Sequence, residues 1–387
     1  MPMEPSRNFD LKLMGGLAGV TVEVLDSPAG QTAAPVTPPC AVNLDGLDDR
    51  ATTQTLQTIG RALWRCALGA SAVAELWRAS IAKSEPDGVL RLRLVIDTPE
   101  LAALPWELLY DERLGRFLAL NGRTPVTRFV RLPLAPLPWP QDRPLRLLFT
   151  GASPGDLATL DVAGEWRGIE TALAPLVAVG RLETSAVAAG ATLSALLAAL
   201  QRGVDLWHFA GHGHDDGLIF CDARGKTEPK AELKAEPQAE LVEAHTLGQM
   251  LAGEGVRLAV LNACRAGAGG GQAASVAGAL VRAGIPAVIA MQADITGAAA
   301  EAFSAAFYDA VAVGQGVDRA TTAARKAIWA AGTSEWWLPA LFMRTPEGRI
   351  WQEPEQTTGT VVNVRGDRNI VIAGAVGGNV TVRQSGL

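Results

Sequence analysis

A histidine and a cysteine close two apolar runs of this chain, and each lies next to glycine or a small residue. His212 ends the run from Asp205 to Gly213, and Cys264 ends the run that starts at Val256, 52 positions later (264 − 212). A thiol with an ordinary pKa of about 8.5 is mostly protonated at neutral pH, so a nearby imidazole is needed to favour the thiolate. The pair therefore predicts a cysteine nucleophile, Cys264, with His212 as its general base.

The glycines around the histidine suit the same chemistry. Gly213 follows His212 directly and offers an unobstructed backbone N–H. Together with the N–H of Cys264 it would form an oxyanion hole, which typically contributes about 3–4 kcal/mol to acyl transfer. Gly211 and Gly213 also let the backbone of a substrate approach closely. The sequence shows no obvious third residue that orients the base.

Other interpretations of these residues stay open. A lone cysteine is often a small buried apolar residue, and His208, inside the apolar run, is expected to be a core histidine with a hydrogen-bond partner. The chain would then be a non-catalytic scaffold that assembles through its C-terminal tail. A third possibility is another thiol acyl-transfer enzyme, such as a transpeptidase. The spacing of His208, His212 and His214 is a weak metal signal without a nearby carboxylate helix, so neither a metal nor a cofactor is predicted.

The elements that must position the pair follow from the rhythm of the sequence after residue 144. Apolar runs alternate with helical patterns there, which predicts a mostly parallel sheet covered by helices on both faces. Side chains that do chemistry collect at the carboxyl ends of such strands, where both His212 and Cys264 are expected. The expected strands lie at 145–150, 181–187, 205–213, 256–264, 286–291 and 339–344, and the expected helices at 163–176, 192–203, 297–313 and 317–331.

Three regions are expected along the chain. Residues 1–140 form an N-terminal α+β region, with strands at 19–24 and 90–97 and one or two helices within 54–81, and it ends in a proline-rich linker. Residues 141–350 form the domain that carries the site. Residues 351–387 form a tail in which two Gly/Asn turns separate β-branched triplets, which predicts a hairpin or stacked β rungs. Such a unit tends to pair with copies of itself, so residues 360–387 are a candidate for self-assembly.

Composition bounds the function classes. The net charge is −6 without a basic excess, which argues against binding to nucleic acid. The N-terminus lacks the basic-then-apolar order of a signal peptide, and no apolar run is long enough to span a membrane. Four scattered cysteines, Cys40, Cys66, Cys221 and Cys264, do not form a disulfide framework, so a cytoplasmic protein is expected.

Two irregular segments adjoin the site strands. Residues 228–243 form a charged low-complexity insert, which is expected to be a solvated loop; the alternative is a regulatory loop that the protein cleaves itself. Residues 266–273 are rich in glycine and follow Cys264 directly, as a mobile binding loop would.

The two site segments resemble the CHAT family, the caspase HetF-associated peptidases of the caspase and separase clan. In the caspase-type pattern the histidine lies about 50 residues before an Ala-Cys-Arg-like turn. The resemblance spans about residues 88–345. It rests on His208 to Gly213, Leu261 to Cys264, Ala290-Met291-Gln292, Phe307-Tyr308, Gly314, Ala324-Arg325, Trp337 to Phe342, and Leu104 to Leu109.

This resemblance implies a caspase-like α/β fold, with residues 1–140 as a pseudo-caspase-like half. It also implies thiol-dependent peptide hydrolysis with Cys264 as nucleophile and His212 as base. Many relatives act in bacterial defence or programmed cell death and cut a partner protein after a trigger. The expected partners are therefore a protein substrate and an activating protein, or a second copy of this chain.

Substrate preference stays open at this stage. The candidate substrate-binding residues are Asn262, Asp294, Asp156 and Arg265. Relatives with basic specificity often have Asp two residues before the nucleophile, where this chain has Asn262. If Asp294 or Asp156 points into the pocket, Arg or Lys before the cleaved bond is expected; a neutral pocket around Asn262 would favour an uncharged side chain.

Overall fold

The computed structural model describes residues 6–16, 19–38, 41–48, 50–85, 88–133, 136, 139–140, 143–188, 190–214, 216–222, 237–265 and 272–352. Three predicted features lie wholly or partly outside these ranges. They are the β tail from residue 353 onward, residues 223–236 with most of the charged insert, and residues 266–271 of the glycine-rich segment.

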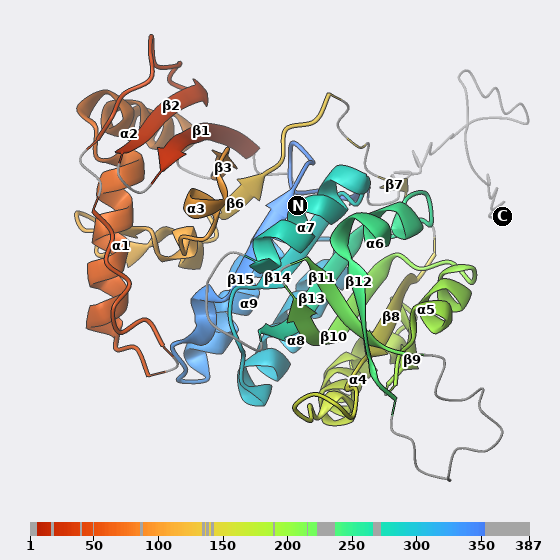
Figure 1. Cartoon of the computed structure of the whole chain (residues 1–387). Helices are drawn as coiled ribbons and strands as arrows, with labels where there is room; N and C mark the ends of the chain where they lie inside the picture. The colour runs from red at the N-terminus through yellow and green to blue at the C-terminus, as the bar shows by residue number, and fades with distance from the viewer. Residues whose placement is uncertain are drawn as a thin grey trace, which may run out of the picture.

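One twelve-stranded sheet runs through the described part of the chain (Figure 1). Ten strands lie in the order β12-β11-β10-β13-β14-β15-β6-β3-β1-β2, and β8 joins the sheet at β10, with β9 beside β8. The strands are β1 (Ser6–Gly16), β2 (Gly19–Asp26), β3 (Val89–Ile96), β6 (Val126–Phe129), β8 (Leu145–Gly151), β9 (Leu182–Val187), β10 (Leu206–His214), β11 (Gly217–Cys221), β12 (Ala239–Glu243), β13 (Leu258–Arg265), β14 (Ala287–Met291) and β15 (Pro339–Met343). Two small pairs stand apart: β4 (Tyr110–Asp111) with β5 (Arg116–Phe117), and β7 (Trp139–Pro140) with β16 (Trp351–Gln352).

The sheet is mostly parallel, as the apolar runs predict. The central neighbours β8, β10, β13 and β14 are all parallel, and so are β15, β6, β3 and β1. Antiparallel pairing occurs between β1 and β2, between β14 and β15, and in the β10-β11-β12 meander. Strands buried on both faces need apolar side chains throughout, and β14 (Ala287–Met291) is buried at every position. The predicted α/β class is confirmed.

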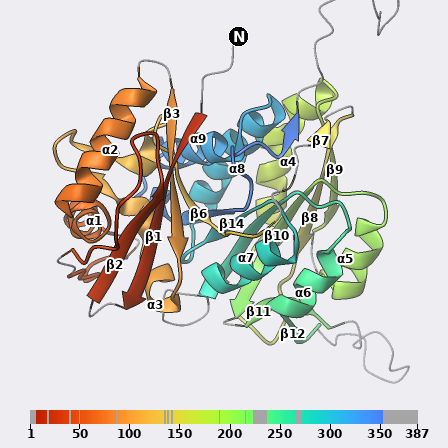
Figure 2. The ribbon, with the colours of Figure 1, turned by 90° about the horizontal axis from the view of Figure 1, so that it is seen from above.

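Helices cover both faces of the sheet, as Figure 2 shows. Residues of β10 alternate between two cores: Leu206 and Ala210 belong to one, Trp207 and Phe209 to the other. The first core includes α4 (Val162–Ala178), α8 (Gly297–Ala312) and α9 (Val317–Ala330), and the second includes α5 (Leu193–Leu200), α6 (Ala244–Leu251) and α7 (Gln272–Ala283). The N-terminal strands carry α1 (Thr53–Leu68), α2 (Ser71–Ser84) and α3 (Pro99–Ala102); the 3₁₀ turns are η1 (Trp106–Leu108), η2 (Leu118–Leu120) and η4 (Glu335–Trp337).

Buried ion pairs fasten the N-terminal strands to the later part of the chain. Arg91 of β3 lies 2.7 Å from the Asp318 carboxylate at the start of α9, and Arg93 forms a pair with Asp10 of β1. All four side chains are less than one-tenth exposed. Together with the pairing of β6 and β15, these contacts make residues 1–140 part of the same sheet as the residues that follow. The predicted division of the chain at residue 140 stays a prediction.

The structure differs from the sequence-based expectation in several strands. β1 and β11 were not predicted, and residues 239–243 of the charged insert form β12 rather than a loop. β10 ends at His214, one residue after the expected end at 213, and His212 lies among its last three residues, as expected. The last part of β10 pairs with β11 in the antiparallel direction. β11 has only five residues, and so short a strand gives a weak signal in the sequence.

Along the described ranges no helix is both long and apolar enough to cross a bilayer. Cys66, on the buried side of α1, is disulfide-bonded. We expected no disulfide framework from the four scattered cysteines, and Cys66 departs from that expectation. Disulfides are rare in a reducing cytosol, so the bond weighs against the predicted compartment.

Candidate active site

Residues 212 and 264 are directly opposite each other on neighbouring parallel strands. The register of β10 and β13 pairs His212 with Cys264, Gly213 with Arg265, and Ala210 with Asn262. Paired Cα atoms of adjacent strands lie about 5 Å apart. The fold therefore brings the two strand positions together, as predicted, although 52 positions (264 − 212) separate them along the chain. The side chains of Cys264 and Arg265 lie outside the described part of the structure.

The strand that pairs with one edge of β10 changes just before His212. One edge of β10 pairs with β8 from Leu206 to Ala210 and with β11 from His212 onward. Gly211 is the point of exchange between the two neighbours. A Cβ atom there would lie 3.0 Å from the carbonyl oxygen of Ala152 and 2.8 Å from the ring of Phe209, so only glycine lets the chain leaving β8 pass this closely.

The loop that leaves β8 orients the imidazole of His212. The Nε2 atom of His212 lies 2.7 Å from the carbonyl oxygen of Ala158. A carbonyl only accepts hydrogen bonds, so Nε2 donates this bond, and in the neutral form of the ring Nδ1 is the unprotonated nitrogen. Nδ1 is buried and has no hydrogen-bond partner among the described residues. His212 therefore has one ring nitrogen held by the loop and one without a partner among the described residues.

Gly213 lies on β10, between β13 and β11. Its Cα is in register with Arg265 of β13 on one side and with Leu218 of β11 on the other. The backbone around the predicted oxyanion donor is thereby held by two neighbouring strands. The donor role of its N–H stays a prediction.

A second group of polar side chains lies deeper along the same two strands. Asn262 donates from Nδ2 to Oε1 of Glu165, at 2.7 Å, and Nε2 of His208 lies 3.1 Å from the same oxygen. The other ring nitrogen of His208 lies 2.8 Å from the hydroxyl of Tyr308 on α8. His208 is therefore the core histidine with partners that the sequence indicated. Glu165 was not predicted, because the first turn of α4 carries no motif; its Trp166, Ile169 and Leu173 only show that the helix is amphipathic.

The two predicted aspartates lie on the loops that follow β8 and β14. Asp156, on the loop after β8, accepts a hydrogen bond from the backbone N–H of Ala239 at 2.8 Å and so holds the start of β12. Asp294 is exposed on the loop after β14. The hydrogen bond that Asp156 accepts therefore comes from the start of β12. Their role in substrate binding stays a prediction, and the acidic side chain next to Asn262 is Glu165.

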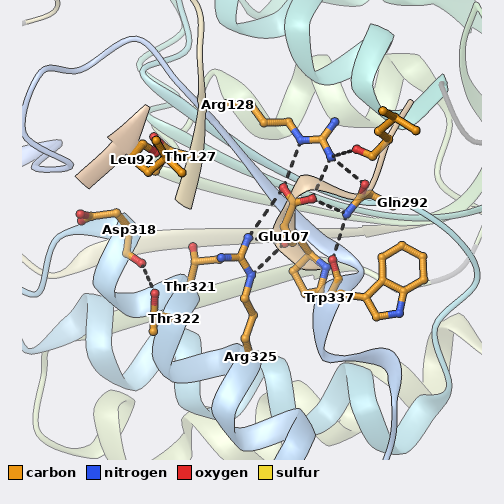
Figure 3. A network of polar contacts seen from close by, with 12 residues as sticks. Leu92, Glu107, Thr127, Arg128, Gln292, Asp318, Thr321, Thr322, Arg325 and Trp337 are labelled. Carbon is orange, nitrogen blue, oxygen red and sulfur yellow. Dashed lines mark hydrogen bonds and ion pairs between the residues drawn. The ribbon is translucent and has the colours of Figure 1, made fainter. Parts of the chain in front are cut away.

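A buried ionic network, shown in Figure 3, connects Glu107, in the segment Pro105-Trp106-Glu107, to the residue after β14. Glu107 accepts two hydrogen bonds from Arg128, and the Arg325 guanidinium lies 4.0 Å from the same carboxylate. Gln292, the residue after β14, donates to Glu107 and to the carbonyl of Trp337, and its own oxygen accepts from Arg128. The network thus fixes the strand end next to β13.

Charges in this network shift the pKa values of its members. Burial alone would raise the pKa of Glu107, but the charge and hydrogen bonds of Arg128, with the charge of Arg325, outweigh it and the pKa is lowered. Burial lowers the pKa of Arg325 to about 10, although Glu107 acts in the opposite direction. One carboxylate therefore serves two buried guanidinium groups.

Among the described residues, no group of three or more His, Cys, Asp or Glu side chains could hold a metal ion.

Comparison with known proteins gives one family and several distant structures. The family profile of the CHAT domain matches residues 54–347. A search of curated proteins gave no match. Among solved structures, the chain is similar to the Arg-specific cysteine proteinase gingipain R, with 13% identity, a TM-score of 0.43, and coverage of 78% of this chain and 69% of that one.

Two further structures are similar at the same level. The complex of the pro- and mature domains of the Porphyromonas gingivalis proteinase gives 12% identity and a TM-score of 0.43 over 79% of this chain and 72% of that one. The Saccharomyces cerevisiae separase–securin complex gives 14% identity and a TM-score of 0.39 over 70% of this chain and 17% of that one.

Proposed function

Because this chain belongs to the CHAT domain family, we propose that it is a cysteine endopeptidase with Cys264 as nucleophile and His212 as general base. One observation carries the proposal. His212 is held through Nε2 by the Ala158 carbonyl, its buried Nδ1 has no partner among the described residues, and position 264 is in register with it. A buried acceptor without a partner is unfavourable, and the thiol of Cys264 is the donor proposed to satisfy it.

The proposed reaction follows from these positions. Nδ1 of His212 takes the thiol proton, and the thiolate attacks the carbonyl carbon of the peptide bond. The N–H groups of Gly213 and Cys264 stabilise the oxyanion. The imidazolium then gives its proton to the leaving amine, and water, activated by the same imidazole, hydrolyses the thioester. The Ala158 carbonyl fixes the ring orientation and stabilises the imidazolium, which is the task of the third member of a catalytic triad.

The biological setting forms part of the same proposal. By resemblance to its family, the enzyme would cleave a partner protein in a bacterial defence or cell-death pathway, and a binding partner or self-association through residues 360–387 would activate it. A cytoplasmic location suits this role, whereas the disulfide of Cys66 is the observation that weighs against it.

Incubation of the full-length protein with a proteome-derived peptide library tests the activity. Mass spectrometry should find new peptide ends with the wild type and none with Cys264→Ala. Ligated ends instead of hydrolysed ends would identify a transpeptidase. New ends that are unchanged in Cys264→Ala would remove the assignment of the nucleophile.

Thiol reactivity provides a prediction that needs no substrate. Cys221 is fully buried, and burial, together with the Asp156 charge, raises the pKa of its thiol despite a hydrogen bond from the Ser153 backbone. At pH 7 we expect iodoacetamide to modify Cys264 at least about 10-fold faster than Cys221, as measured by peptide mass spectrometry over time. His212→Ala should abolish the advantage. Equal rates for the two thiols in the wild type would favour a non-catalytic scaffold.

A further inference from the structure

We propose that Glu165 and Asn262 form the site that binds the side chain of the substrate residue before the cleaved bond, and that this side chain is Lys or Arg. The inference rests on the proposed peptidase activity and adds the substrate class. Its starting point is the buried Oδ1 atom of Asn262, which has no partner among the described residues and lies on a side chain that contacts the Glu165 carboxylate.

Asn262 presents a buried acceptor. The residue is 6% exposed, and its Nδ2 group donates to Glu165 at 2.7 Å. That bond fixes the orientation of the amide, so Oδ1 points away from Glu165. Oδ1 is buried and has no hydrogen-bond partner among the described residues. A carbonyl-type oxygen in this state requires an N–H or O–H donor.

Glu165 presents a second acceptor close by. Its Oε1 atom accepts from both Asn262 and His208, whereas Oε2 has no hydrogen bond or ion pair in the described part of the chain. The side chain is 18% exposed, so solvent reaches it. No described Lys or Arg forms an ion pair with it. A mostly buried carboxylate favours a nearby cation.

Both ring nitrogens of His208 have partners. The hydroxyl of Tyr308 is buried and lies 2.8 Å from Nδ1 of His208. Burial, with the nearby Glu165 charge, raises the pKa of Tyr308 well above its usual value. A carboxylate only accepts hydrogen bonds, so Nε2 of His208 donates to Oε1 of Glu165. His208 and Asn262 therefore both occupy Oε1.

The position of the Glu165 carboxylate, next to Asn262, suits the binding of a substrate side chain. Asn262 precedes residue 264 by two positions on β13, which is about 6.6 Å along a strand. A Lys or Arg side chain can bridge that distance from a backbone held at the nucleophile. Its several N–H donors match the two acceptors, and its charge matches the carboxylate.

Peptide kinetics with the full-length protein test the inference. Fluorogenic peptides that differ only in Arg, Lys, Gln or Leu before the cleaved bond are compared for wild type, Glu165→Gln, and the matched control Glu170→Gln, which changes an exposed carboxylate on the same helix. We expect Glu165→Gln to lower kcat/KM for the Arg and Lys peptides by about 10- to 100-fold. The Gln peptide should change by less than about threefold, and Glu170→Gln should behave as wild type.

Several results would overturn the assignment. Cys264-dependent cleavage without preference for Arg or Lys would refute it and leave the proposed function intact. An equal loss for all four peptides in Glu165→Gln would make Glu165 a positioning residue only. Agmatine, a guanidinium on a short alkyl chain, gives a readout that needs no catalysis: titration calorimetry should detect binding to wild type and to Cys264→Ala but not to Glu165→Gln. Absence of binding to the wild type would also overturn the proposal.

Discussion

Replacing His212 with Ala is expected to lower kcat/KM for peptide hydrolysis by about 1,000- to 10,000-fold. A positioned general base typically contributes about 100- to 10,000-fold, and here the same imidazole also returns the proton to the leaving amine. The Ala158 carbonyl would lose its donor but remain in place, because it belongs to the loop backbone. Initial rates with the best peptide, at saturating and at low concentrations, measure the loss.

His214→Ala is the matched control for this experiment. His214 lies at the end of the same strand, its side chain is about half exposed, and its Nδ1 contacts only the neighbouring Asp216 among the described residues. The control should keep the activity of the wild type. If His212→Ala retained more than about one-tenth of the wild-type kcat/KM while circular dichroism showed an unchanged fold, another group would be the base.

Glu107→Ala is expected to destabilise the protein by about 3–5 kcal/mol. The change leaves two buried guanidinium groups, Arg128 and Arg325, without their counter-charge, and breaking a buried ion pair from one side has a cost of this size. Both arginines are at most 3% exposed at their side chains. Urea denaturation followed by tryptophan fluorescence measures the free energy of unfolding.

Glu183→Ala supplies the contrast, because the pair of Arg146 and Glu183 is exposed at both side chains and exposed pairs contribute about 0–1 kcal/mol. A loss from Glu107→Ala no larger than that of this control would contradict the role of the network. The pH dependence has a defined sign. The pKa of Glu107 is lowered in the folded state, so its contribution is present above the unfolded-state pKa and is lost as the pH falls through the folded-state pKa. Glu107→Gln should therefore lose less stability on acidification.

Much of the fold could be predicted from the sequence, because buried parallel strands are short apolar runs that stand out between helices. This class includes β8, β10, β13 and β14. The neighbouring positions of residues 212 and 264 could therefore be predicted from two apolar runs and from the tendency of reactive side chains to lie at the carboxyl ends of parallel strands. The match to the CHAT domain over 54–347 confirms the predicted family.

The parts that could not be predicted depend on contacts between distant segments. The Ala158 carbonyl contacts His212 from the loop that follows β8 and passes close to Gly211 of β10. Such a contact is made by a backbone atom, so no residue type in the sequence indicates it. Glu165 meets Asn262 across 97 positions (262 − 165) through helix packing. Asp156 and Asp294 were the acidic candidates from the sequence, whereas the acidic group that contacts Asn262 comes from a helix.

The order in which the strands leave the ribosome differs from their order in space. β15 (Pro339–Met343) is made last among the strands of the large sheet, yet it lies between β14 and β6 and joins the two halves. Until about residue 343 has been synthesised, β14 and β6 each have an edge without its neighbouring strand β15. Unpaired strand edges are sites of aggregation. The long sequence separation between β6 and its partner also predicts slow closure of the sheet. The nascent chain is therefore expected to depend on chaperones until its final strand arrives.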